Sequence, residues 1–168
     1  MKSSLYLICL FFLVGIFFTE SANAQTFSAN QKESLKGLDA MLVVVDFAQD
    51  AVVTDGLNQE QLEIDIRRKV AAAGIRLMGE MEWSRSEGVP YLYVYLNTLR
   101  SELGFYAYRA EVKLNQEVIL KRNRGLSQMA STWEAGTLGA VGHERISSLS
   151  AEILELVDVF IADYKDVN

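Results

Sequence analysis

The sequence predicts an α+β fold in which two helices pack on one face of a mainly antiparallel five-stranded sheet. Two segments, residues 58–74 and 146–164, carry apolar side chains at helical spacing. Four runs of alternating or β-branched residues follow one another between these segments with no helical pattern separating them. Consecutive strands of this kind pair as antiparallel neighbours, so the expected order is β-α-β-β-β-β-α.

The first strand is expected at residues 38–47, which are rich in valine and other strand-forming residues. The first helix is expected to begin at Asn58, where Gln61 stands at the third helical position as in a capping box. Gly74 is expected to end this helix. Its buried side consists of apolar residues three or four positions apart: Leu62, Ile66, Val70 and Ala73.

Four further strands are expected at residues 75–83, 91–97, 105–122 and 129–133. The strand at 105–122 keeps one alternating phase throughout, which favours a single long, bent strand over a hairpin near Asn115. Residues 135–142 contain three glycines and are expected to form a loop. The last helix has an apolar side and an acidic side, which indicates packing on the sheet and not on a membrane surface.

The first 24 residues are typical of a cleavable secretory signal peptide. Lys2 precedes an uncharged apolar stretch at residues 5–18, and Ala22-Asn23-Ala24 provides small residues at the cleavage site. The alternative, an uncleaved anchor helix, requires about 20 apolar residues. The predicted organisation is a signal peptide at 1–24, a flexible lead at 25–36 and one domain at 37–168. We expect an exported protein that resides in a Gram-negative periplasm, with release outside the cell as the less favoured alternative.

Composition excludes several classes of function. Loss of Lys2 and Glu20 with the signal peptide leaves the net charge at −6, which disfavours long-range attraction to nucleic acid. Cys9 is the only cysteine and lies within the signal peptide, so the processed chain has no thiol chemistry. One histidine and no cysteine cannot form a structural zinc site. The sequence predicts no metal, no cofactor and no transmembrane segment after cleavage.

The candidates for catalysis are weak. His143 is the only histidine, and as a neutral imidazole beside Glu134 or Glu144 it can serve as a base. The alternative is an exposed histidine in a first helical turn. Gly139 and Gly142 stand before the last helix, where free N–H groups can bind an anion, but the segment lacks the lysine of a phosphate-binding loop. A plain connection is the alternative there.

Tyr91, Tyr93 and Tyr95 are the stronger candidates for binding. In the expected third strand they alternate with Leu92, Val94 and Leu96, so they point to the opposite face of the sheet. If the leucine and valine side faces the helices, the tyrosines line an uncovered face suited to a protein or ligand interface. The alternative is that a neighbouring loop, or the N-terminal lead with Phe27, covers them.

Several stretches resemble a family of exported bacterial proteins of uncharacterised function. They are GLNQEQLEIDIRRKVAAAGI, PYLYVYLNT, YAYRAEVKLNQEVILKR, STWEAGTLG and LVDVFIADYKDVN, which together span most of residues 37–168. The resemblance implies a bacterial envelope setting and supplies no catalytic residues. We therefore expect a non-catalytic periplasmic binding or assembly module, with another envelope protein or a second copy as partner. An envelope hydrolase centred on His143 and the glycine-rich segment is the alternative.

Overall fold

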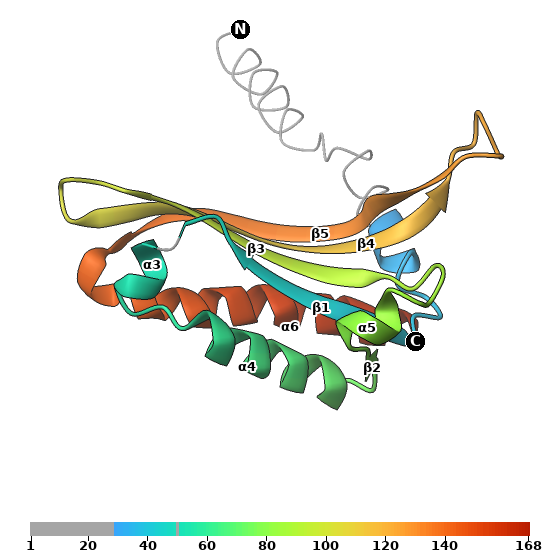
Figure 1. Cartoon of the computed structure of the whole chain (residues 1–168), viewed down its shortest axis with the longest axis horizontal. Coiled ribbons are helices and arrows are strands. Elements are labelled where there is room, and N and C mark those ends of the chain that lie inside the picture. The colour runs from blue at the N-terminus through green and yellow to red at the C-terminus, as the bar shows by residue number, and fades with distance from the viewer. Residues whose placement is uncertain (1–28, 50) are drawn as a thin grey trace, which may run out of the picture. The chain divides into compact units, whose positions relative to one another are not determined.

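The computed structural model describes residues 29–49 and 51–168 (Figure 1). The predicted signal peptide lies outside the described residues. The folded unit spans Gln31–Asn168. Leu35 is fully buried in its core, and the Lys32 ammonium lies 2.8 Å from the Asp163 carboxylate. The folded unit therefore begins ahead of residue 37, within the segment expected to be a lead.

The sheet has five strands in the order β2-β1-β3-β4-β5. Their bounds are β1 Ala40–Phe47, β2 Arg76–Leu77, β3 Tyr91–Arg100, β4 Phe105–Ile119 and β5 Ser127–Gly142. β1 is parallel to both β2 and β3, whereas β3, β4 and β5 are joined as antiparallel neighbours. The sheet is thus mixed, and the expectation of a mainly antiparallel sheet is wrong. The cause is the helix after β1, which returns the chain to the end where β1 began.

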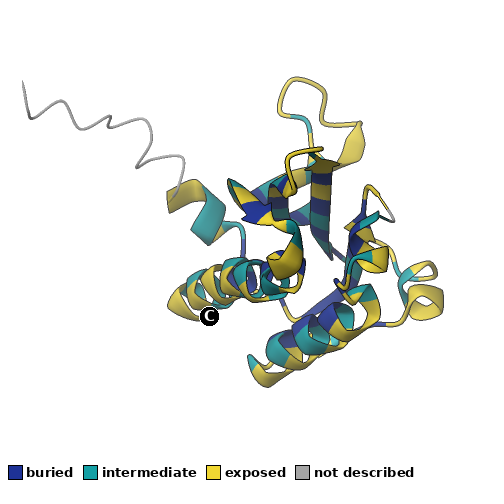
Figure 2. Cartoon of the chain, turned by 90° about the vertical axis from the view of Figure 1, so that its left-hand side faces the viewer, coloured by how far each residue is buried: buried dark blue, intermediate teal, exposed yellow. Residues whose placement is uncertain are grey.

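The two long helices are α4 (Gln59–Ala72) and α6 (Leu149–Val167), and both pack on the same face of the sheet, as expected (Figure 1). Asn58 caps α4, since its side-chain oxygen accepts a hydrogen bond of 2.9 Å from the backbone N–H of Gln61. The core lies between this face and the helices, and its buried residues are the dark blue segments of the ribbon in Figure 2. Trp133 and Phe160 meet edge to face at its centre, with ring centroids 5.1 Å apart.

Between β1 and β3, two short helices were not expected: α3 (Ala51–Thr54) and α5 (Glu80–Trp83). The 3-10 helix η1 (His143–Ser148) precedes α6 and contains His143 in its first turn. α5 occupies most of the segment predicted as the second strand, of which only β2 is extended. The alternation of residues 75–83 is misleading there, because Gly79 starts a helical turn that the Trp83 indole fastens to the Val89 carbonyl at 2.8 Å.

β5 differs most from expectation. The predicted strand at 129–133 and the predicted loop at 135–142 form one strand that pairs with β4 along its whole length. β4 is a single strand, as expected, with a register irregularity at Leu114/Asn115. The glycines adopt strand geometry because β4 supplies hydrogen-bond partners along its edge. At Gly139 the reason for glycine is steric, since an added Cβ would lie 2.6 Å from the Tyr108 hydroxyl oxygen.

Candidate functional site

The face of the sheet opposite α4 and α6, called the open face below, carries the predicted tyrosines. Leu92, Val94 and Leu96 are at most 1% exposed and point into the core, so β3 presents its other side chains to the open face. These are the half-buried Tyr91, Tyr93 and Tyr95, called the tyrosine row below. The three tyrosines therefore lie on the face predicted by the alternation, while Phe27, the predicted alternative cover, lies outside the described residues.

The rings of the tyrosine row are fixed by contacts with one another. Tyr93 and Tyr95 are stacked, with centroids 5.8 Å apart, and Tyr91 meets Tyr93 edge to face at 6.4 Å. Trp83 of α5 packs against Tyr91 at 5.8 Å and covers that end of the row. The Tyr93 hydroxyl donates a 2.7 Å hydrogen bond to Asp46 of β1. Desolvation, followed by this hydrogen bond, raises the pKa of Tyr93 to about 12.

A charged network lies beside the tyrosine row on β4. Glu111 is opposite Tyr95 in the sheet register, and its side chain is only 12% exposed. Its carboxylate lies 2.6 Å from the Arg109 guanidinium and 2.9 Å from the Lys113 ammonium. The carboxylate is thus neutralised by two cations, which allows it to stay nearly covered on this face.

The open face continues from this network into a shallow depression of about 620 Å³ over β4 and β5. Gly136 deepens the depression, because it has no side chain and stands opposite Glu111. The lining residues are Arg109, Glu111, Glu134, Ala135, Gly136, Thr137 and Leu138. The tyrosine row, the charged network and this depression form one surface across β3, β4 and β5.

A second polar group gathers at the end of the sheet where β3 turns into β4. It consists of Asp55, Arg100, Tyr106 and His143 and is called the His143 cluster below. The His143 Nε2 atom lies 2.6 Å from the Asp55 carboxylate, which also accepts a hydrogen bond from the Tyr106 hydroxyl. The imidazole stacks on the Tyr106 ring with centroids 5.7 Å apart.

The electrostatics of the His143 cluster favour an ionised Asp55. The Tyr106 hydrogen bond is the main cause that lowers the pKa of Asp55. Desolvation opposes this effect, and His143 and Arg100 add smaller effects that also lower the pKa. Burial, and then the bond to Asp55, raises the pKa of Tyr106. Because Asp55 is a carboxylate, Nε2–H donates to it and cannot also accept from Arg100, whose Nη2 lies 3.1 Å away. Arg100 therefore acts on Asp55 as a nearby positive charge and does not donate a hydrogen bond to His143.

This arrangement differs from the one expected around His143. Its carboxylate partner is Asp55, at the end of α3, whereas Glu134 stands opposite Lys113 on β4, eight residues before Gly142. Gly139 makes room for Tyr108, and Gly142 precedes η1 without a close neighbour. The predicted combination of His143, Glu134 and the glycines is therefore not assembled. Asp55 carried no sequence signal, because its link to His143 spans 88 residues.

The His143 cluster borders a depression of about 470 Å³ lined by Arg100, Ser101, Glu102, Gly104 and His143. A carboxylate that holds one imidazole nitrogen leaves the ring able to move a proton through the other, as in hydrolytic enzymes. Among the described residues, no group of three or more histidine, cysteine, aspartate or glutamate side chains is placed to hold a metal ion. The same described residues include no helix both long and apolar enough to span a membrane.

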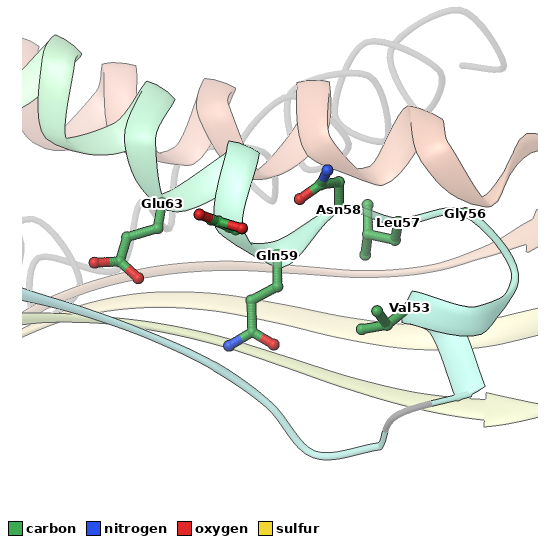
Figure 3. Close-up of a pocket in the computed structure, with 7 residues that line it drawn as sticks. Val53, Gly56, Leu57, Asn58, Gln59 and Glu63 are labelled. Carbon is green, nitrogen blue, oxygen red and sulfur yellow. The ribbon is translucent and has the colours of Figure 1, made fainter.

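The hollow between α3 and the start of α4 is also open, with a volume of about 640 Å³ (Figure 3). Val53, Gly56, Leu57 and Asn58 lie along its upper and right-hand parts in Figure 3, and Glu63 points outward from α4. The Gln59 side chain donates a 3.0 Å hydrogen bond to the Val45 carbonyl of β1. The titratable side chains that line this hollow are two carboxylates, Glu60 and Glu63.

Comparison with known proteins gives structural likenesses only. No family model matches the chain, and no curated protein matches it. The PelC dodecamer of Paraburkholderia phytofirmans has 17% identity and a TM-score of 0.42 over 77% of this chain and 90% of that one. A neuraminyllactose-binding hemagglutinin homolog from Helicobacter pylori has 10% identity and a TM-score of 0.41 over 79% and 84%. A minor lipoprotein from Acinetobacter baumannii has 12% identity and a TM-score of 0.29 over 74% and 87%. Likeness at this level assigns neither a family nor an activity.

Proposed function

We propose that the chain is an exported envelope protein that serves as a non-catalytic binding module and holds a protein partner on its open face. The observation that carries the proposal is the tyrosine row beside a paired charged network, on the face that α4 and α6 leave uncovered. The secretory pattern of residues 1–24 supports export, with the periplasm as the site of action.

The geometry suits a protein partner because the surface is rigid before binding. Stacking and the bond to Asp46 already restrict Tyr93, so little side-chain freedom is lost on association. Tyrosine offers an apolar ring with a polar tip and is enriched at protein interfaces. Glu111 keeps both of its cations when the surface is covered, so burial by a partner leaves no unpaired carboxylate.

The proposal is tested by crosslinking the tagged protein in its native cells and identifying the crosslinked partner by mass spectrometry. Tyr95→Ser removes one ring of the row and is expected to lower the yield of the partner at least about tenfold, as for loss of a buried aromatic anchor. Val159→Ser, at a 47% exposed position on α6, is the matched control and should leave the yield unchanged. A partner retained equally by both variants, or no partner for the wild type, contradicts the proposal.

A hydrolytic site at His143 is the second candidate, and the 2.6 Å contact between its Nε2 atom and Asp55 favours it. Asp55 would hold the imidazole while the ring accepts a proton from water in the neighbouring depression. A broad hydrolase screen on the wild type and on His143→Ala tests this candidate. Any activity that survives the substitution in full removes His143 from the reaction.

A further inference from the structure

β5 is one of the two edge strands of the sheet and is unusually well suited to pair with another strand. It is 16 residues long, contains no proline, and carries a single charged residue, Glu134. Natural edge strands are normally short, charged or interrupted by proline, because unpaired backbone groups invite association. Apart from Glu134, the length and composition of β5 include none of these protections.

The pairing with β4 determines which backbone groups of β5 point outward. The His143 N–H donates to the Gly104 carbonyl of the β3–β4 turn at 3.0 Å. Between the register irregularity and this bond, from Trp133 to Val141, the residues at odd positions therefore direct their backbone groups toward β4. The residues between them direct theirs to the free edge: Glu134, Gly136, Leu138, Ala140 and Gly142. The side chains of Glu134, Leu138 and Ala140 lie on the open face, and that of Leu138 is 81% exposed.

The opposite edge of the sheet is protected in a different way. β2 ends at Leu77, and beyond it the outward carbonyls of β1 are bonded by side chains of α4. Arg67 donates to Val43 at 3.3 Å, and Gln59 donates to Val45 at 3.0 Å. On β5 one carbonyl has a comparable contact, a 3.3 Å bond from the Ser34 hydroxyl to Thr132. Within residues 29–49 and 51–168, the stretch from Glu134 to Gly142 receives no such side-chain bond.

We propose that this edge joins two copies of the chain through antiparallel pairing of β5 with its own counterpart. A two-fold axis at Leu138 places this exposed side chain against its equivalent in the second copy. The same register sets Glu134 opposite Gly142, which keeps the two carboxylates apart. A strand with so little charge is suited to self-pairing even though each chain has a net charge of −6.

The pairing has a direct consequence for the surface described above. Directly opposed residues of antiparallel strands project from the same face, so the two open faces become one continuous face of a ten-stranded sheet. Both pairs of long helices then lie together on the other side. This inference uses backbone groups of β5 and does not depend on the tyrosine row binding a partner.

Light scattering after size exclusion, over a range of concentrations of the processed chain, tests the proposal. The wild type is expected at twice the monomer mass. Leu138→Lys places two like charges together at the axis and is expected to raise the dissociation constant at least about tenfold. Leu103→Lys, at an 84% exposed position in the β3–β4 turn, is the matched control and should remain dimeric. Far-ultraviolet circular dichroism shows whether each variant is folded.

A cysteine variant tests the register. Cys9 is the only cysteine of the sequence and is lost with the predicted signal peptide, so Leu138→Cys introduces the single thiol of the processed chain. Hydrogen-bonded antiparallel partners have Cα atoms about 5.5 Å apart, within disulfide range. Oxidation should crosslink Leu138→Cys and not Leu103→Cys. A wild type that stays monomeric, or a dimer that Leu138→Lys leaves intact, overturns the proposal.

Discussion

A methyl group added at Gly139 would lie 2.6 Å from the hydroxyl oxygen of Tyr108 and 2.8 Å from its Cζ atom. Carbon atoms in favourable contact are about 3.5–4.0 Å apart, so Gly139→Ala must displace the tyrosine ring. Tyr108 is 6% exposed, and its hydroxyl donates a hydrogen bond to Glu152 of α6. Displacement therefore disturbs both the packing under α6 and a bond to a carboxylate.

The expected loss of stability follows from these two effects. A hydrogen bond to a charged group contributes about 1.5–3 kcal/mol, and overpacking of a core costs about 1–3 kcal/mol. Part of this loss of stability is offset, because the ring can relax partly and because alanine lowers the conformational entropy of the unfolded chain. We expect Gly139→Ala to lower the free energy of unfolding by about 2–4 kcal/mol, and Tm by roughly 3 °C for each kcal/mol.

Urea unfolding followed by circular dichroism measures this loss, with two controls. Gly142→Ala meets no atom within 4 Å at a φ of −62°, so it should change stability by less than about 0.5 kcal/mol. In a Tyr108→Ala background the obstructing ring is absent, and the cost of Gly139→Ala should disappear. Equal stability of Gly139→Ala and Gly142→Ala in the otherwise unchanged chain would refute the steric reasoning.

Three further predictions concern the tyrosines, Asp55 and the core. The pKa of Tyr93 and of Tyr108 is raised to about 12, chiefly by desolvation for Tyr93 and by the Glu152 hydrogen bond for Tyr108. Their contribution to stability is present below pH 10 and lost as the pH rises through about 12. Tyr93→Phe and Tyr108→Phe should each remove one late-ionising phenol from an ultraviolet absorbance titration, and an unchanged titration would contradict this. The pKa of Asp55 is lowered, chiefly by the Tyr106 hydroxyl, so its contribution is present above its ordinary value of 3.8 and lost as the pH falls through the folded value. Asp55→Asn should weaken the acid dependence of urea midpoints, and the idea fails if the two pH profiles run parallel. Phe160 is fully buried against Trp133, so Phe160→Ala should cost about 3–5 kcal/mol in urea unfolding, against about 0.5 kcal/mol or less for the exposed Val159→Ala. Similar costs for the two would count against the assigned core.

Local patterns were sufficient for the parts of the fold that depend on near neighbours. The cap at Asn58 and the ending at Gly74 predict α4 because helix ends are decided within a few residues. Leu92, Val94 and Leu96 predict the buried side of β3, and with it the tyrosine row, because side chains alternate along any strand. The tyrosine part of the surface that we propose as a binding site was therefore predictable from the sequence.

The charged partners of that surface were not visible in the same way. Glu111 lies beside Tyr95, and Asp46 beside Tyr93, through the strand register of β4 and β1. Register depends on the turns and on the buried faces of both strands, so a single strand pattern does not specify it. The same limit applies to His143, whose carboxylate partner comes from a segment 88 residues away.

What the sequence by itself determined is the two long amphipathic helices, the buried side of β3, and the secretory pattern at the start. Only the tertiary structure decided that β1 runs parallel to β3 and that residues 135–142 belong to β5. Periodicity reports which side of a segment avoids water, a local property of the chain. Strand pairing depends on what lies alongside, and β4 offers a continuous row of hydrogen-bond partners that outweighs the low strand propensity of Gly136, Gly139 and Gly142.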